Sequence, residues 1–189
     1  MVVEPSFTAL RAEPTTAGTE WAGMMAAQVA AALALEPHRE GGYFRETYRS
    51  PLRVATPAGP RPAATAILYL LTAESPSRFH RLRFDEIWFY HAGAPAELFL
   101  LGGAAGGATP GADRLLVAPD SPQVLVPGGR WMGGRVVPGA PGGAPTHPGW
   151  TLVGCVVTPG FEYEDFELGR QDELVAAFPA AADLIRVLS

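Results

Sequence analysis

The stretch "SRFHRLRFDEIWFYHAG", residues 77–93, contains the side chains best suited to chemistry. It holds two histidines, two adjacent carboxylates and several aromatic residues. An imidazole near neutral pKa can take a proton when a second group orients its other nitrogen. Imidazole and carboxylate together can also bind a metal ion. The stretch is therefore a candidate metal site, a candidate acid–base site, or a strand whose polar residues are merely paired.

Alternation along a strand decides which of these side chains can act together. Glu86, Trp88 and Tyr90 share one face, and His91 lies on the other, where it is expected to pack or to face a partner subunit. If the first face lines a barrel, it forms an apolar pocket with one carboxylate, a common form of small-molecule site. The alternative is that Glu86 lies at the rim and pairs with a nearby arginine.

The bulk composition limits the class of protein. The 189 residues are 48% hydrophobic and 17% charged, which predicts one sizeable buried core. The net charge is -5 and the 14 Lys and Arg form no basic run, so we expect no nucleic-acid partner. Cys155 is the one cysteine, and it is interpreted as a buried small hydrophobe. No signal pattern and no apolar run of about 20 residues is evident, which predicts no membrane partner and a cytoplasmic location.

Residue patterns along the chain favour an all-β fold with helices at its ends. Residues 1–18 are expected to be a disordered extension, and 19–189 a single domain with a helix at about 20–35 after the N-cap Thr19 and before Pro37. Short β-prone runs separated by Gly/Pro-rich turns follow, as in a sandwich or barrel. The tail "QDELVAAFPAAADLIRVL" predicts two short helices broken at Pro179.

Two segments resemble the signatures of the cupin superfamily. His80, Glu86 and Gly93 match the pattern G-x5-H-x-H-x3-E-x6-G, and "PGGRWM" resembles the core of the second signature, P-x-G-x2-H. The second histidine of the first signature is Leu82 here, and the histidine of the second is Met132. Leucine offers no donor and a thioether is a poor ligand for the usual metals, so no metal and no cofactor is predicted.

Four segments in order are similar to a branch of small, single-domain cupins. They are "LEPHREGGYFRETYRS", "PSRFHRLRFDEIWFYHAG", "VLVPGGRWMGG" and "CVVTPGFEYEDFELG". The resemblance implies a double-stranded β-helix (jelly roll), a homodimer, and a small-molecule ligand inside the barrel. The run "TPGFEYEDFELG" is expected to lie over the barrel mouth.

"GGYFRETY" also resembles a stretch of the metal-free nucleotide-sugar epimerases, in which Phe44 and Glu46 match ligand contacts. The resemblance implies His80 as general base. Glu86 is then the candidate that orients it, and the acid is a phenol, with Tyr43, Tyr69, Tyr90 and Tyr163 left open. His38 and His147 lie in loop contexts and are expected to be solvent residues.

The sequence thus predicts a metal-independent epimerase or isomerase acting on a small carbohydrate-like or nucleotide-derived ligand. His80 and Glu86 are its predicted catalytic residues. A non-catalytic binding protein and a metal-dependent oxygenase or isomerase are the alternatives. The predicted ligand contacts are Tyr43, Phe44, Glu46, Trp88, Tyr90, Trp131 and Met132.

Overall fold

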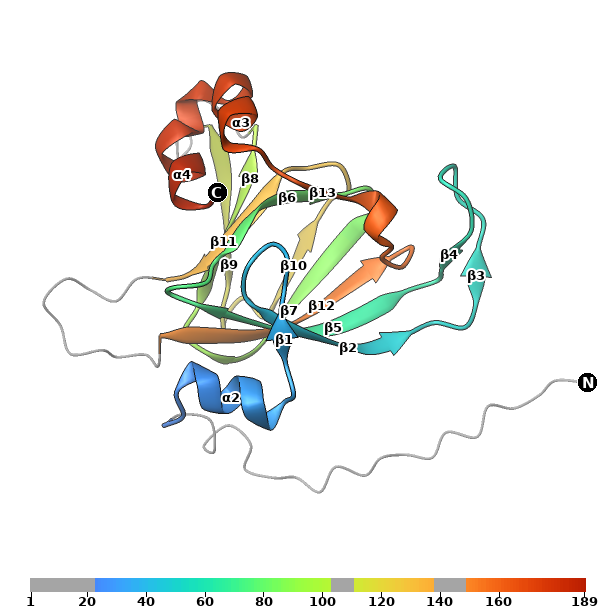
Figure 1. Cartoon of the computed structure of the whole chain (residues 1–189), viewed down its shortest axis with the longest axis horizontal. Helices are drawn as coiled ribbons and strands as arrows, with labels where there is room; N and C mark the ends of the chain where they lie inside the picture. Colours follow the sequence, from blue (N-terminus) through green and yellow to red (C-terminus); the bar gives the residue numbers. More distant parts are fainter. Residues whose placement is uncertain (1–22, 103–110, 138–148) are drawn as a thin grey trace, which may run out of the picture.

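The computed structural model describes residues 23–102, 111–137 and 149–189 (Figure 1). The predicted disorder of residues 1–18, the predicted N-cap Thr19 and His147 lie outside these ranges. None of the helices formed by the described residues is long and apolar enough to cross a membrane.

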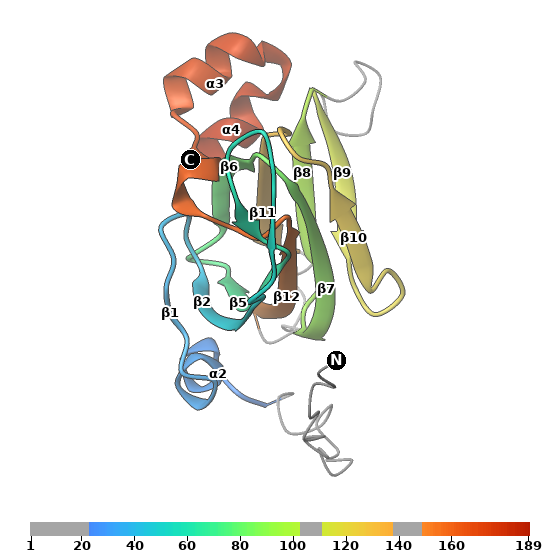
Figure 2. The ribbon, with the colours of Figure 1, turned by 90° about the vertical axis from the view of Figure 1, so that its right-hand side faces the viewer.

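Two antiparallel sheets face each other and form a jelly roll, which confirms the predicted all-β fold (Figures 1 and 2). The six-stranded sheet has the order β1-β2-β5-β12-β7-β10, and the five-stranded sheet the order β13-β6-β11-β8-β9. The strands of the first sheet are β1 (Glu36–Pro37), β2 (Tyr43–Arg49), β5 (Thr65–Thr72), β12 (Trp150–Thr158), β7 (Asp85–Gly93) and β10 (Gln123–Val126). Those of the second are β13 (Phe166–Leu168), β6 (Ser77–Leu82), β11 (Met132–Val136), β8 (Ala96–Leu101) and β9 (Ala112–Val117). A separate hairpin pairs β3 (Arg53–Val54) with β4 (Arg61–Pro62).

The most apolar strands are buried on both faces, which explains why they read as continuous hydrophobic runs. On β5, Tyr69 and Leu71 point into the core between the sheets, whereas Leu70 packs under the N-terminal helix α2 (Ala26–Ala32). On β8, Leu98 points into the same core, and Phe99 packs against the C-terminal helices. These are α3 (Gln171–Ala177) and α4 (Ala182–Val187), joined by the 3-10 turn η2 (Pro179–Ala181).

The predicted break at Pro179 is confirmed, but the N-terminal helix is shorter than the expected 20–35. Met25 still has an extended backbone (φ -74°, ψ 153°), and the helix ends at Ala32. Ala34 then adopts a positive φ of 50°, and Pro37 does not cap the helix but pairs with Tyr43 in the sheet. The pairing of β1 with β2 therefore overrides the local helix propensity.

The close approach of β7 to the start of β12 requires glycine at position 93. Gly93 has a φ of 95°, and a Cβ atom there would overlap the carbonyl and ring of Trp150. The next amide, that of Ala94, donates to the Trp150 carbonyl at 2.8 Å. The last glycine of the first signature is thus a packing requirement of the fold.

Gly93→Ala should destabilise the protein more than Gly129→Ala. Both glycines have a positive φ, 95° and 81°, but a Cβ on Gly129 would meet no atom within 4 Å. Gly129→Ala should cost about 1–2 kcal/mol for the backbone conformation. Gly93→Ala should cost a further 1–3 kcal/mol or so for the overlap. Urea unfolding measures both, and equal losses would contradict the close approach.

Candidate functional site

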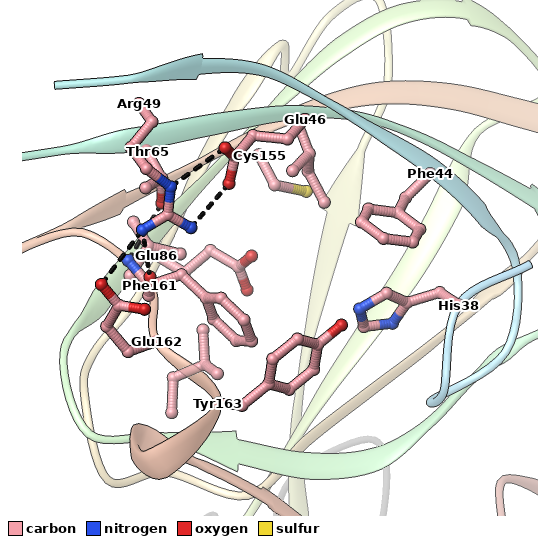
Figure 3. A pocket seen from close by; sticks show the side chains of 13 residues that line it. His38, Phe44, Glu46, Arg49, Thr65, Glu86, Cys155, Phe161, Glu162 and Tyr163 are labelled. Atoms are coloured by element: carbon pink, nitrogen blue, oxygen red, sulfur yellow. Dashed lines mark hydrogen bonds and ion pairs between the residues drawn. The ribbon is translucent and has the colours of Figure 1, made fainter. Parts of the chain in front are cut away.

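A cavity of about 220 Å³ lies against the inner face of the six-stranded sheet (Figure 3). Its volume is below the roughly 300–1,000 Å³ usual for small-molecule sites, so it suits a small ligand. Strands from both sheets and the segment after β12 supply its apolar wall: Phe44, Ile67, Leu82, Val157 and Phe161. Leu82, which stands where a metal-binding cupin has its second histidine, is therefore part of the apolar lining.

Glu86 is the buried acid of this cavity. Its side chain is 6% exposed, and its Oε2 accepts a hydrogen bond of 2.9 Å from the indole N–H of Trp88. Burial, followed by the nearby negative charge of Glu40, raises the pKa of Glu86 to about 8, although hydrogen bonds from Trp88 and Cys155 partly oppose this. At pH 7 Glu86 is mainly a neutral carboxylic acid, which can donate a hydrogen bond to a ligand.

His38 is the imidazole that faces the cavity. Its ring points into the space between Phe44 and Tyr163, and it packs edge-on against Phe44 with the ring centroids 4.6 Å apart (Figure 3). Burial is the main cause of the lowered pKa of His38, and the charge of Glu40 partly restores it. The ring is therefore neutral at pH 7. Among the described residues, Nε2 has no hydrogen-bond partner, so this nitrogen is free to act on a ligand.

Glu40 holds the other nitrogen of His38. Nδ1 lies 3.4 Å from Oε2 of Glu40 and also 3.4 Å from the Glu40 backbone nitrogen. A protonated Nδ1 can donate to the carboxylate, and an unprotonated Nδ1 can accept from the backbone N–H. Both tautomers of His38 are therefore compatible with one position of the ring. A side chain that takes up a proton and returns it needs this property.

His80 lies behind Glu40 and outside the lining of the cavity. Its side chain is 2% exposed and stacks on Phe166. Nδ1 lies 2.8 Å from the carbonyl oxygen of Arg78, which can only accept, so Nδ1 carries a proton. Nε2 lies 3.3 Å from Oε2 of Glu40. His80 therefore lies against the same carboxylate oxygen that contacts His38.

A charge network occupies the mouth of the cavity. Arg49 donates to both carboxylate oxygens of Glu46, at 3.0 and 2.8 Å, and to Glu162 at 3.1 Å (Figure 3). Arg53 approaches Glu162 at 3.6 Å. These side chains are between about a third and a half exposed, so the mouth is the solvated end of the site.

The structure brings only part of the predicted site together. Of the predicted site residues, Phe44, Glu46 and Glu86 line the cavity. The assignment of Glu86 as the partner of His80 is wrong, because the carboxylate beside His80 belongs to Glu40 and Glu86 is bonded to Trp88.

Several predicted ligand contacts lie elsewhere because strand register and neighbouring helices place them there. Tyr43 points outward against the cluster under α2, and Trp131 packs beside the C-terminal helices. Met132 is a core residue paired with His80 across β11 and β6. Trp88 is buried behind Glu86, and the Tyr90 hydroxyl donates to the carbonyl of Gly93 at 2.7 Å.

The predicted solvent location of His38 is also wrong, because the turn that carries it packs against β6 and leaves the His38 side chain only 8% exposed. His91 is exposed on the outer face of β7, where its ring lies next to Gly154. Of the four tyrosines left open as acids, Tyr163 is the one among the described residues that lines the cavity. It follows Phe161 and Glu162, so the segment expected over the mouth does contribute to the site.

Sequence reasoning missed His38, Glu40 and Arg49 for a local reason. The turn at Gly41 and Gly42, with φ of 106° and 65°, brings "HRE" back toward β6. A bulge in β2 between Glu46 and Tyr48 then places Glu46 and Arg49 on the same face. The H-x-E spacing of His38 and Glu40 was the available signal.

The residues present do not fit the three-histidine, one-glutamate metal centre of the superfamily. Leu82 and Met132 lack suitable donors, both nitrogens of His80 are engaged, and Glu86 is bonded to Trp88. Among the described residues, no group of three or more His, Cys, Asp and Glu side chains is arranged to hold a metal ion.

Glu86→Gln should remove a pH dependence of stability above pH 6.5. A carboxyl whose pKa is raised from 4.5 to about 8 keeps its proton in the folded state but loses it in the unfolded state. Stability therefore falls as pH rises from 4.5 to about 8, by about 1.4 kcal/mol for each unit of pKa shift. Gln keeps the acceptor for Trp88. Urea unfolding of both proteins at pH 6.5 and 9 measures the effect, and parallel losses would contradict a neutral Glu86.

Comparison with known proteins supports the fold and places the chain in a family. A hypothetical protein from Leishmania major is 37% identical over 88% of this chain and 99% of its own, with a TM-score of 0.76. A protein from Shewanella oneidensis is 32% identical over 88% of this chain and 98% of its own, with a TM-score of 0.72. No curated protein matches the chain. Residues 27–169 match the family model described as "Cupin superfamily (DUF985)", and the chain therefore belongs to this family of cupins.

Proposed function

We propose that this cupin is a metal-independent isomerase or epimerase that moves a proton on a small carbonyl compound. The observation that supports it is that one neutral imidazole, His38, and one neutral carboxylic acid, Glu86, line the same cavity. They come from different elements, the first from the turn before β2 and the second from β7. Two groups whose environments keep them in complementary roles are typical of acid–base sites.

The step that this pair can perform is enolisation. Nε2 of His38 takes a proton from the carbon next to the carbonyl, and the C–H electron pair becomes a carbon–carbon double bond. The carbonyl electron pair moves to oxygen, where the O–H of Glu86 donates a hydrogen bond and stabilises the charge. In an α-hydroxy carbonyl compound, Glu86 then gives its proton to this oxygen and takes the proton of the neighbouring hydroxyl group. The imidazolium of His38 returns its proton to the former carbonyl carbon, so the carbonyl moves by one carbon and both side chains regain their starting state. All atoms are conserved and no further reactant is needed.

The volume of the cavity narrows the substrate predicted from sequence. About 220 Å³ suits a small carbohydrate-like carbonyl compound better than a nucleotide diphosphate sugar. The Arg49 guanidinium is already bonded to Glu46 and Glu162, so it offers little to a diphosphate. We therefore favour the small carbonyl compound over the nucleotide-derived ligand.

His38→Asn should abolish deuterium exchange next to a carbonyl. We expect the wild-type protein in D₂O to accelerate exchange at the α-carbon of hydroxyacetone or of 2-hydroxyacetophenone, as followed by proton NMR. Loss of the general base should lower the rate by about 10²–10⁴-fold. His91→Asn is the matched control, because His91 is exposed on the outer face of β7. If the wild type only binds these compounds and exchanges no proton, a non-catalytic binding protein replaces the isomerase.

Glu40→Gln should slow the same exchange and shift its pH profile. The charge of Glu40 raises the pKa of His38 against the effect of burial, so its removal should move the acid limb of the profile to lower pH. A purely structural role would lower the rate without moving this limb. Glu167→Gln is the control, because Glu167 pairs with Arg81 on the surface at 2.6 Å. An unshifted profile for Glu40→Gln would exclude Glu40 as the residue that positions His38.

A further inference from the structure

The charged side chains at the mouth of the cavity are paired with one another. Of the residues that line it, Arg49 forms ion pairs with Glu46 and Glu162, and Arg53 lies 3.6 Å from Glu162. Two guanidinium groups thus face two carboxylates. Further inside, Glu86 carries its proton and His38 is neutral. The exposed Arg39 lies 4.4 Å from the ring centroid of Tyr163, where solvent screens its charge.

Arg49 is the cation that an anionic ligand would be expected to use, but its donors are already committed. Nε and Nη2 donate to the two oxygens of Glu46, and Nη1 donates to Glu162 and to the carbonyl of Phe161 at 3.2 Å. This fork-to-fork pairing with Glu46 is the strongest geometry for such a pair. An anion entering the cavity would have to displace a carboxylate that is already in place.

A charged ligand would also lose its hydration in an apolar cavity. Apart from Thr65, Cys155 and Tyr163, the remaining wall consists of Phe44, Ile67, Leu82, Val157 and Phe161. A buried ion without a partner is costly, whereas an uncharged group can be satisfied by one or two hydrogen bonds. Glu86 and His38 can supply these bonds.

We propose that the cavity binds small uncharged ligands, and that Glu46 sets this specificity by neutralising Arg49. The inference rests on the proposed function for the identity of the cavity as the binding site, but it requires binding and not turnover. Glu46 is thus a specificity-determining residue. Without Glu46, the positive charge of Arg49 would become available to an anionic ligand.

Three probes with the same 4-fluorophenyl ring and different charges test the proposal. They are the neutral 4-fluorobenzyl alcohol, the anion 4-fluorobenzoate and the cation 4-fluorobenzylammonium. Fluorine NMR titration of the full chain at pH 7 measures their affinities. We expect the alcohol to bind about tenfold or more tightly than either ion, the size of effect expected for an unpaired charge. Equal affinity for the alcohol and either ion, or no binding of the alcohol, would overturn the proposal.

Two variants with opposite charge changes complete the test. Glu46→Gln leaves Arg49 underpaired, so benzoate should gain about tenfold relative to the alcohol. Arg49→Met leaves the carboxylates unopposed, so benzylammonium should gain instead. Glu167→Gln changes the net charge by the same amount as Glu46→Gln, but Glu167 belongs to the surface pair with Arg81, so the ratios should stay as in the wild type.

Circular dichroism and thermal unfolding check that the variants fold, which we expect because Glu46 and Arg49 are each 38% exposed. Unchanged ratios in both folded variants would overturn the role of Glu46. The exchange assay with His38→Asn is independent of these titrations. If the protein prefers the alcohol but catalyses no proton exchange, the result supports the specificity for uncharged ligands and contradicts the proposed isomerase activity.

Discussion

The Glu40 carboxylate is the contact on which the arrangement of the site depends. It accepts a hydrogen bond from Ser77 at 3.0 Å and lies within 3.4 Å of a ring nitrogen of both His38 and His80. Its backbone carbonyl accepts the amide of Arg78 at 2.7 Å. Since Ser77, Arg78 and His80 belong to β6, this one residue joins the turn before β2 to the facing sheet. The same contacts that close the barrel therefore fix His38 at the cavity.

The negative charge of this carboxylate also affects the protonation of neighbouring groups. Its negative charge is the second cause, after burial, of the raised pKa of Glu86, and it also raises that of Tyr69. The protonated state of Glu86 thus follows from the position of Glu40. In a cavity of low dielectric constant two acids cannot easily both be ionised, and the one without a cationic or imidazole partner keeps its proton.

The sequence predicted the fold well because the signals for it are periodic and repeated. Strand alternation and the breaks at glycine and proline depend on local residues, and the two signatures placed β6 and β7 correctly. The cavity was predicted less well. Glu86 and Phe44 could be assigned to an inner face by alternation. Arg49 could not, because a bulge at Thr47 shifts the alternation by one residue, and His38 could not, because a turn rather than a strand positions it.

The changes at the metal positions of the superfamily and the proposed chemistry have one physical cause. Met132 packs in the core and Leu82 forms part of the cavity wall, so the surroundings of Glu86 become apolar rather than coordinating. A carboxylate in a metal centre is held ionised by the cation, whereas the same side chain in an apolar wall takes a proton. Replacement of two ligands thus converts the remaining glutamate from an acceptor into a donor. The histidine of the signature, His80, is displaced from the cavity for the same reason. Without a metal position to face, it contacts Glu40 instead. His38 is then the imidazole that lines the cavity.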